Sequence, residues 1–284
     1  MSWKAYEVVF RLCTPLHSGW RKIGNLQMTR PYVTGRMLWG ALTMRLTRGA
    51  AGSRSATDSK EYQNVGQQVN EILAFTYFYP ALHDGSDYRV VWPWEDEANF
   101  RHRFLSSYAS TALDYPQHAA AERSLHEVEF LSPYTIDDGQ PVYLLGYFFE
   151  NDGCPLNWRW AIRRLQLGGE RGYGWGLVEP VGEPKVIANN NLFGGTAIFN
   201  GSYKRPFLTV PKDRYLLAHT RAEQALPVQG GIEPLVGREW RSTNANNRYA
   251  GQHVKYNAVC FVPGSKLKKQ ASFRISKLGM WEKR

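Results

Sequence analysis

Residues 167–177 (LGGERGYGWGL), here called the glycine-rich loop, restrict the possible folds of this chain more than any other segment. Its five glycines are Gly168, Gly169, Gly172, Gly174 and Gly176. Such a backbone must turn through positive φ or lie very close to other atoms. Arg171, Tyr173 and Trp175 stand between the glycines. Backbone N–H groups and a guanidinium can bind phosphate oxygens, and aromatic rings can stack on bases, so the segment favours RNA binding.

The surroundings of the loop exclude two better-known phosphate-binding motifs. No Lys-Ser or Lys-Thr follows the last glycines, so the loop is not a P-loop. A dinucleotide-binding fingerprint follows a strand and opens a helix, whereas this loop is expected to follow a helix and open a strand at 177–181. A glycine-rich hairpin without a ligand remains the alternative when the loop is taken alone.

Residues 155–167 predict the helix that leads into the loop. Its apolar residues Trp158, Ala161, Ile162 and Leu165 recur at helical spacing, and Asn157 is placed to cap its start. Arg163 and Arg164 lie near its end. We therefore expect these two arginines to converge with Arg171 on one anion.

The charge balance also favours a nucleic acid or another polyanion as partner. Thirty-five Lys and Arg against 25 Asp and Glu give a formal net charge of +10 in 284 residues. Aromatic residues make up 14% of the chain, which suits a folded domain with stacking surfaces. Three scattered cysteines are too few for a disulfide framework or a zinc site, so we expect a reducing cytoplasm, no metal and no cofactor. Glu7 and Arg11 interrupt the first apolar run, and no run is long enough to cross a membrane.

The remaining pattern alternates strands with helices, which predicts an α+β fold. Strands are expected at 6–13, 88–92, 127–130, 142–149, 192–203, 207–210 and 254–262. Helices are expected at 36–48, with Gly49 as its cap, at 66–77 and, more weakly, at 95–108. Residues 50–62 predict a mobile loop, and the turn signal at 137–139 joins the two strands around it. The Pro and Gly residues at 180–184 suggest a domain boundary.

Three motifs resemble those of the RAMP superfamily, the RRM-like subunits of CRISPR effector complexes. They are TPLHSG at 14–19, YVTGRMLWGAL at 32–42 and GGERGYGWG at 168–176. Together they extend the resemblance over roughly residues 1–182. Family members commonly have proline where this chain has Thr34, so that position departs from the pattern.

The C-terminal motifs PLVGREW at 234–240 and CFVPGS at 260–265 are more loosely similar to type III-D members that occupy the place of the crRNA 5′-handle subunit. The resemblance implies a ferredoxin-like, RRM-like RAMP domain at 1–182 and a β-rich part at 183–284, either a tandem or a degenerate second unit. It also implies a non-catalytic, crRNA-binding subunit that contacts other RAMP backbone subunits and the large polymerase-like subunit, and target RNA indirectly.

We expect the RNA-binding residues to be those of the loop and its basic surroundings. They are Arg163, Arg164, Gly168, Gly169, Arg171, Gly172, Tyr173, Trp175, Lys22, Arg36 and Arg238. Two alternatives remain open. Some RAMP relatives are metal-independent endoribonucleases that process pre-crRNA with a histidine, and His17 is the one histidine at a family motif. In the other, the chain is a scaffold that binds acidic neighbours through its basic surface.

Overall fold

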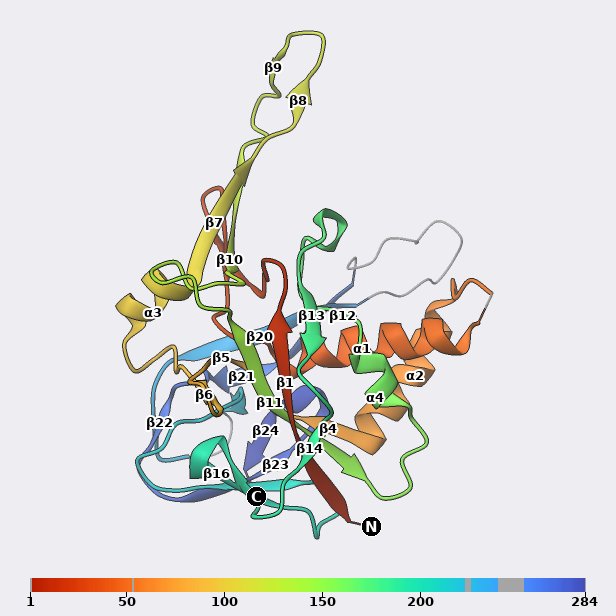
Figure 1. The fold of residues 1–284 in the computed structure, drawn as a ribbon, viewed down its shortest axis with the longest axis vertical. Helices are drawn as coiled ribbons and strands as arrows, with labels where there is room; N and C mark the ends of the chain where they lie inside the picture. The colour runs from red at the N-terminus through yellow and green to blue at the C-terminus, as the bar shows by residue number, and fades with distance from the viewer. Residues whose placement is uncertain (1, 53, 223–225, 240–252, 284) are drawn as a thin grey trace.

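A central antiparallel sheet organises the fold (Figure 1). The computed structural model describes residues 2–52, 54–222, 226–239 and 253–283. The main path of the sheet runs β12-β13-β1-β11-β5-β6, with β14 paired to β1 and β4 paired to β11. Its strands are β1 (Trp3–Leu12), β4 (Leu73–Phe75), β5 (Tyr79–His83), β6 (Tyr88–Val90), β11 (Tyr143–Asn151), β12 (Leu165–Gln166), β13 (Leu177–Pro180) and β14 (Lys185–Val186).

Four of these strands and two helices follow the βαββαβ pattern. Helix α1 (Gly35–Ala50) separates β1 from β5, and α4 (Trp158–Ile162) separates β11 from β13. The spatial order β13-β1-β11-β5 is that of a ferredoxin-like unit. Helix α2 (Ser59–Ile72) is added after α1. The α+β expectation and the ferredoxin-like unit are therefore confirmed.

The central sheet is buried on both faces because its strands carry apolar side chains on both faces. In β1, Tyr6, Val8 and Phe10 pack toward the core that includes residues of α1, α2 and α4, whereas Ala5 and Val9 pack toward a second core. Strand β11 divides in the same way, with Phe148 in the first core and Phe149 in the second. Residues from 192 to 281 complete the second core. The molecule thus has three layers: helices, central sheet and C-terminal sheet.

The C-terminal sheet has the order β15-β16-β17-β23-β24-β18-β21-β20. Its strands are β15 (Asn191–Leu192), β16 (Ala197–Asn200), β17 (Phe207–Val210), β18 (Thr220–Arg221), β20 (Ile232–Glu239), β21 (His253–Phe261), β23 (Ala271–Ile275) and β24 (Trp281–Lys283). The pair β19 (Val228–Gln229) and β22 (Lys266–Leu267), and the 3-10 turns η2 (Phe193–Gly195) and η3 (Lys277–Gly279), complete this part. Within the described residues after 183 there is no α-helix. The tandem or degenerate second unit stays a prediction.

A third sheet and a two-stranded tip form an arm that extends from one end of the molecule (Figure 1). Its strands are β2 (Gly19–Ile23), β3 (Leu26–Thr29), β7 (Leu105–Ser110) and β10 (His126–Leu131), with β8 (Leu113–Asp114) and β9 (Ala119–Ala120) at the tip. Helix α3 (Glu97–Phe104) leads into it and confirms the weaker helix expectation in part. The turn at 137–139 does connect β10 to β11, but the two strands belong to different sheets and do not form a hairpin.

Several helix boundaries differ from the expected ones. Helix α2 ends at Ile72 and not at residue 77, because the next residues form β4. Helix α1 continues through Gly49, which makes room for the ring of Trp160 instead of capping the helix. Helix α2 begins at Ser59, capped by the Asp58 side chain, so part of the expected 50–62 loop is helical. Helix α4 does start after an Asn157 cap, but it ends at Ile162, well before residue 167.

Candidate nucleic-acid interface

The glycine-rich loop is the connection of a β12-β13 hairpin and is held against residues 13–17. The Gly169 N–H donates to the His17 carbonyl at 2.9 Å, and the Gly176 N–H donates to the Pro15 carbonyl at 2.7 Å. The Thr14 hydroxyl donates to the Gly174 carbonyl at 3.0 Å and accepts from the Leu177 N–H at 2.9 Å. Two motifs that lie 150 residues apart in the sequence thus form one backbone-bonded unit.

The glycines of the loop serve different purposes. Gly168, Gly174 and Gly176 have φ near +80°, as the sequence predicts. A Cβ on Gly168 would lie 2.3 Å from the His17 carbonyl oxygen, and one on Gly176 would lie 1.8 Å from the Leu167 carbonyl oxygen. Gly172 has neither a positive φ nor a close neighbour, so the expected reason for a glycine does not apply there.

His17 lies at the corner where the loop joins the arm. Its ring is buried, and Nδ1 donates to the Glu129 carbonyl at 2.7 Å, because a carbonyl oxygen can only accept. A neutral ring therefore has its basic nitrogen at Nε2. The Glu129 side chain also accepts from the Thr29 N–H and pairs with Arg101. His17 braces this corner and also lines the cleft described next.

An open cleft of about 1700 Å³ lies between α1, the glycine-rich loop and β20; we call it the α1 cleft. Five arginines and one aspartate line it, and two of the arginines, Arg30 and Arg36, are paired with glutamates behind the lining. The cleft is therefore positive. Six residues singled out from the sequence gather here from four segments: His17, Arg36, Gly168, Gly169, Arg171 and Arg238. Arg171 is exposed, and its Nη1 lies 3.4 Å from the Met44 sulfur. Its guanidinium is thus available to an anion.

The other predicted residues lie outside this cleft. Arg163 is exposed and pairs with Glu183 at 3.1 Å, and Arg164 is also exposed. Neither of these side chains lines the α1 cleft with Arg171. Lys22 is exposed on β2, beside the cleft-lining Trp20. Tyr173, at the tip of the loop, is 78% exposed and open to stacking.

Trp175 has a packing role that the sequence did not reveal. Its ring packs edge-on against Phe130 at 5.0 Å between ring centroids, and Tyr108 lies next to it. These partners are on β10 and β7, so Trp175 joins the glycine-rich loop to the base of the arm. Gly172 lies at the exposed turn of the same loop, next to Tyr173.

Arg36 fixes the wall of the cleft that α1 and β20 share. Its Nη2 donates to the Arg238 carbonyl at 3.1 Å and lies 3.7 Å from a Glu239 oxygen. Its guanidinium packs against Gly237, where a Cβ would lie 2.2 Å from Cζ. Burial lowers the pKa of Arg36, and Glu239 opposes the shift. The Arg238 side chain is exposed, and Trp240, the end of the PLVGREW motif, lies outside the described residues.

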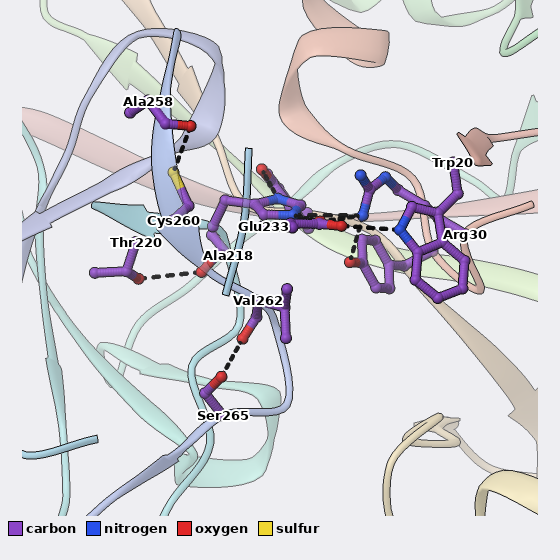
Figure 2. Close-up of polar contacts among 12 residues, drawn as sticks. Trp20, Arg30, Ala218, Thr220, Glu233, Ala258, Cys260, Val262 and Ser265 are labelled. Carbon is purple, nitrogen blue, oxygen red and sulfur yellow. Dashed lines mark hydrogen bonds and ion pairs between the residues drawn. The ribbon is translucent and has the colours of Figure 1, made fainter. Parts of the chain in front are cut away.

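A buried polar network at the floor of the cleft went unnoticed in the sequence. Figure 2 shows Trp20, Arg30 and Glu233 meeting at one point. Arg30 Nη1 and the His219 ring both lie 2.5 Å from Glu233 Oε1, and Trp20 Nε1 donates to Oε2 at 2.8 Å. The Tyr77 hydroxyl lies 2.8 Å from His219 Nδ1. In the sequence, the one local sign of this network is the pair Trp20-Arg21 directly after TPLHSG. The Arg21 guanidinium carbon lies 4.1 Å from the centre of the Trp20 ring.

The charges of this network are set by burial and pairing. Burial opposes ionisation of Glu233, but hydrogen bonds from His219 and Arg30, together with the Arg30 charge, outweigh it and lower the pKa of Glu233 to about 2. Burial lowers the pKa of His219, so its ring is neutral near pH 7. A neutral His219 donates from Nε2 to Glu233 and accepts from Tyr77. Trp20, at 38% exposure, is held in place by this network at the cleft edge.

Within the part of the chain that the structure describes, no group of three or more His, Cys, Asp or Glu side chains is placed to hold a metal ion. The same part contains no helix with the length and apolar character needed to span a membrane.

No protein-family model matches the sequence, and no curated protein matches it. Solved structures match its fold. A chain in the cryo-EM structure of the Type III-B Cmr-beta bound to cognate target RNA and AMPPnP aligns over 92% of this chain and 86% of its own length, with a TM-score of 0.52 and 13% identity. The two chains share a fold. Chains of Cmr-beta bound to cognate target RNA and in the apo state each cover 62% of this chain, with TM-scores of 0.40 and 0.38 and 11% and 10% identity.

Proposed function

We propose that this chain is a non-catalytic RNA-binding subunit of a type III CRISPR effector complex and that it holds crRNA, through its 5′ handle, in the α1 cleft. The observation that carries the proposal is the gathering of Arg36, Arg171 and Arg238 with the glycine-rich loop in one basic cleft. The fold shared with a Cmr-beta chain supports the setting. In this proposal the partners are crRNA, other RAMP backbone subunits and the large polymerase-like subunit, with target RNA contacted indirectly, and the similarity to type III-D members suggests the subtype.

The cleft offers the two kinds of contact that single-stranded RNA needs. Arg171 and Arg238 present exposed guanidinium groups to phosphates. Trp20, fixed by Glu233 and flanked by Arg21, presents a ring to a base at the edge of the cleft. Phosphate contacts position the strand, and unstacked bases supply specificity.

Substitution of Arg171 tests this function most directly. We expect Arg171→Glu to weaken binding of repeat-derived RNA at least about tenfold, because it replaces a phosphate-binding cation in the cleft with an anion. The measurement is a filter-binding titration at fixed salt. Lys269→Glu is the matched control, since Lys269 is exposed and lies outside the α1 cleft. Equal losses in the two variants would contradict the proposal and favour a scaffold whose RNA contacts are incidental.

A metal-independent endoribonuclease is the second candidate, because His17 lines the cleft with Nε2 as its basic nitrogen. If the chain has this function, the wild-type protein cleaves repeat RNA in the presence of EDTA and the His17→Ala variant does not. Unchanged repeat RNA in both proteins favours the binding subunit. Retention of RNA binding by His17→Ala separates loss of chemistry from loss of the corner that His17 braces.

A further inference from the structure

A second open cleft, of about 1450 Å³, adjoins the first; we call it the α2 cleft. It lies between α2, residues 204–205, β23 and η3. Seven residues line both clefts, among them Arg36, Trp39, Tyr62, Arg238 and Asn257. The two hollows therefore meet along one shared wall of α1 and β20, which we call the junction.

The α2 cleft is more basic than the first. Nine Lys and Arg side chains line it against three Glu side chains. Two of those glutamates are already neutralised within the chain: Glu282 by Arg221 and Arg274, and Glu239 by Lys255 and Arg36. Glu71, the third, accepts a hydrogen bond from Gln67. Nine cations against three carboxylates leave the described lining of the α2 cleft with an excess of positive charge.

Three lysines contribute most directly to this excess. Lys60, Lys204 and Lys277 are exposed, and none of them has an ion pair among the residues that the structure places. Arg205 lies beneath them, where burial and the charge of Arg274 lower its pKa to about 10. A bound anion would relieve this repulsion.

The junction presents aromatic surface beside the cations of the two clefts. Trp39 and Tyr62 are partly exposed and line both clefts there. Cations next to aromatic rings suit a nucleic-acid strand, which has both phosphates and bases to contact, better than an acidic protein surface.

We infer that an RNA strand held in the α1 cleft continues over the junction into the α2 cleft, where Lys60, Lys204 and Lys277 contact its phosphates. This inference rests on the proposed function and extends it: the chain holds a longer single-stranded segment than the glycine-rich loop alone can reach. The α2 cleft recognises the backbone and not the sequence, because its free groups are flexible ammonium ions.

Affinity as a function of RNA length tests the inference. Oligouridylates of about 5, about 10 and about 15 nucleotides span the range of site sizes of single-strand-binding clefts. We expect wild-type affinity in fluorescence anisotropy to rise at least about tenfold from the shortest to the longest. In Lys60→Glu/Lys204→Glu/Lys277→Glu this gain should vanish, while the shortest RNA binds as in wild type. For three lost phosphate contacts, the slope of log affinity against log salt on the longest RNA should fall by about 2.

The matched control is Lys185→Glu/Lys268→Glu/Lys269→Glu, which changes net charge equally at exposed lysines outside both clefts. If the two triple variants bind the longest RNA with equal affinity and still bind the shortest RNA, the RNA contacts inferred for the α2 cleft are wrong. The proposed function then still stands. A wild-type protein that binds neither these three RNAs nor repeat-derived RNA would overturn both. Thermal unfolding of each variant confirms that it is folded before its affinity is compared.

Discussion

At the residue scale, the glycine-rich loop shows that one residue type can meet quite different demands. Gly176 combines a positive φ with a carbonyl oxygen 1.8 Å from where a Cβ would lie, whereas Gly172 faces open space. Composition identified the segment as constrained. Composition could not show which glycines are most constrained, because the contacts that constrain them come from the distant residues 14–17 and from the loop's own backbone.

We predict that Gly176→Ala destabilises the protein by about 1–3 kcal/mol or more, because the new Cβ requires a strained φ and collides with the Leu167 carbonyl. Gly172→Ala should change the free energy of unfolding by less than about 0.5 kcal/mol. Urea unfolding of both variants measures the difference. Similar losses of stability in the two variants would contradict this prediction, because local geometry would then not decide the cost of a side chain in the loop.

At the element scale, the start of α4 was predicted more closely than its end. The Asn157 cap of α4 was predicted, but Leu165 and Leu167 belong to β12 and its continuation, where both are buried. Leu165 fits a helical period from Trp158 and also alternates with Leu167, so periodicity alone could not decide. Pairing of β12 with β13 decides it, and that pairing depends on the glycine-rich turn.

Thr34, which departs from the resemblance, caps α1 in place of a proline. Its side chain accepts from the Met37 N–H at 3.4 Å, and its φ of −78° and ψ of 153° suit proline as well. We predict that Thr34→Pro changes stability little, since the backbone N–H of Thr34 has no acceptor in the described chain, while Thr34→Ala loses about 1 kcal/mol. Thermal unfolding of the two variants measures which of them is less stable. A proline variant less stable than the alanine variant would contradict this account.

At the scale of the whole molecule, the two β-rich parts are joined by a polar contact as well as by a shared core. Glu233 and His219 from the C-terminal part meet Arg30 and Tyr77 from the N-terminal part. The sequence predicted the α+β class and the first ferredoxin-like unit. It could not predict this contact, because its members are separated by up to about 200 residues and carry no local periodicity. The division at residue 182 stays a prediction.

This contact predicts that stability falls with acid. The unfolded chain protonates His219 near pH 6.5 and Glu233 near pH 4.5, whereas the folded chain keeps both unprotonated to lower pH, Glu233 to about 2. The unfolded state then binds more protons, so the free energy of unfolding decreases as pH falls below about 6.5. Urea unfolding between about pH 7 and about pH 3 should show a shallower decrease in Glu233→Gln.

Glu122→Gln is the control for that measurement, because Glu122 is exposed on the arm. If Glu233→Gln and wild type lose stability in parallel as the pH falls, Glu233 is not the source of the acid sensitivity. A parallel decrease in Glu122→Gln and wild type is the expected result.

The double burial of the central sheet has a consequence for synthesis on the ribosome. Helices α1, α2 and α4 can cover one face as soon as residue 182 has emerged, but the other face needs Trp281, which is fully buried beside Phe273. At ordinary translation speeds that delay is about 5–20 s. Throughout it, Ala5, Val9 and Phe149 form an apolar surface open to chaperones or to misassociation. Codon usage and chaperone supply during the last third of translation should therefore govern how much functional protein accumulates.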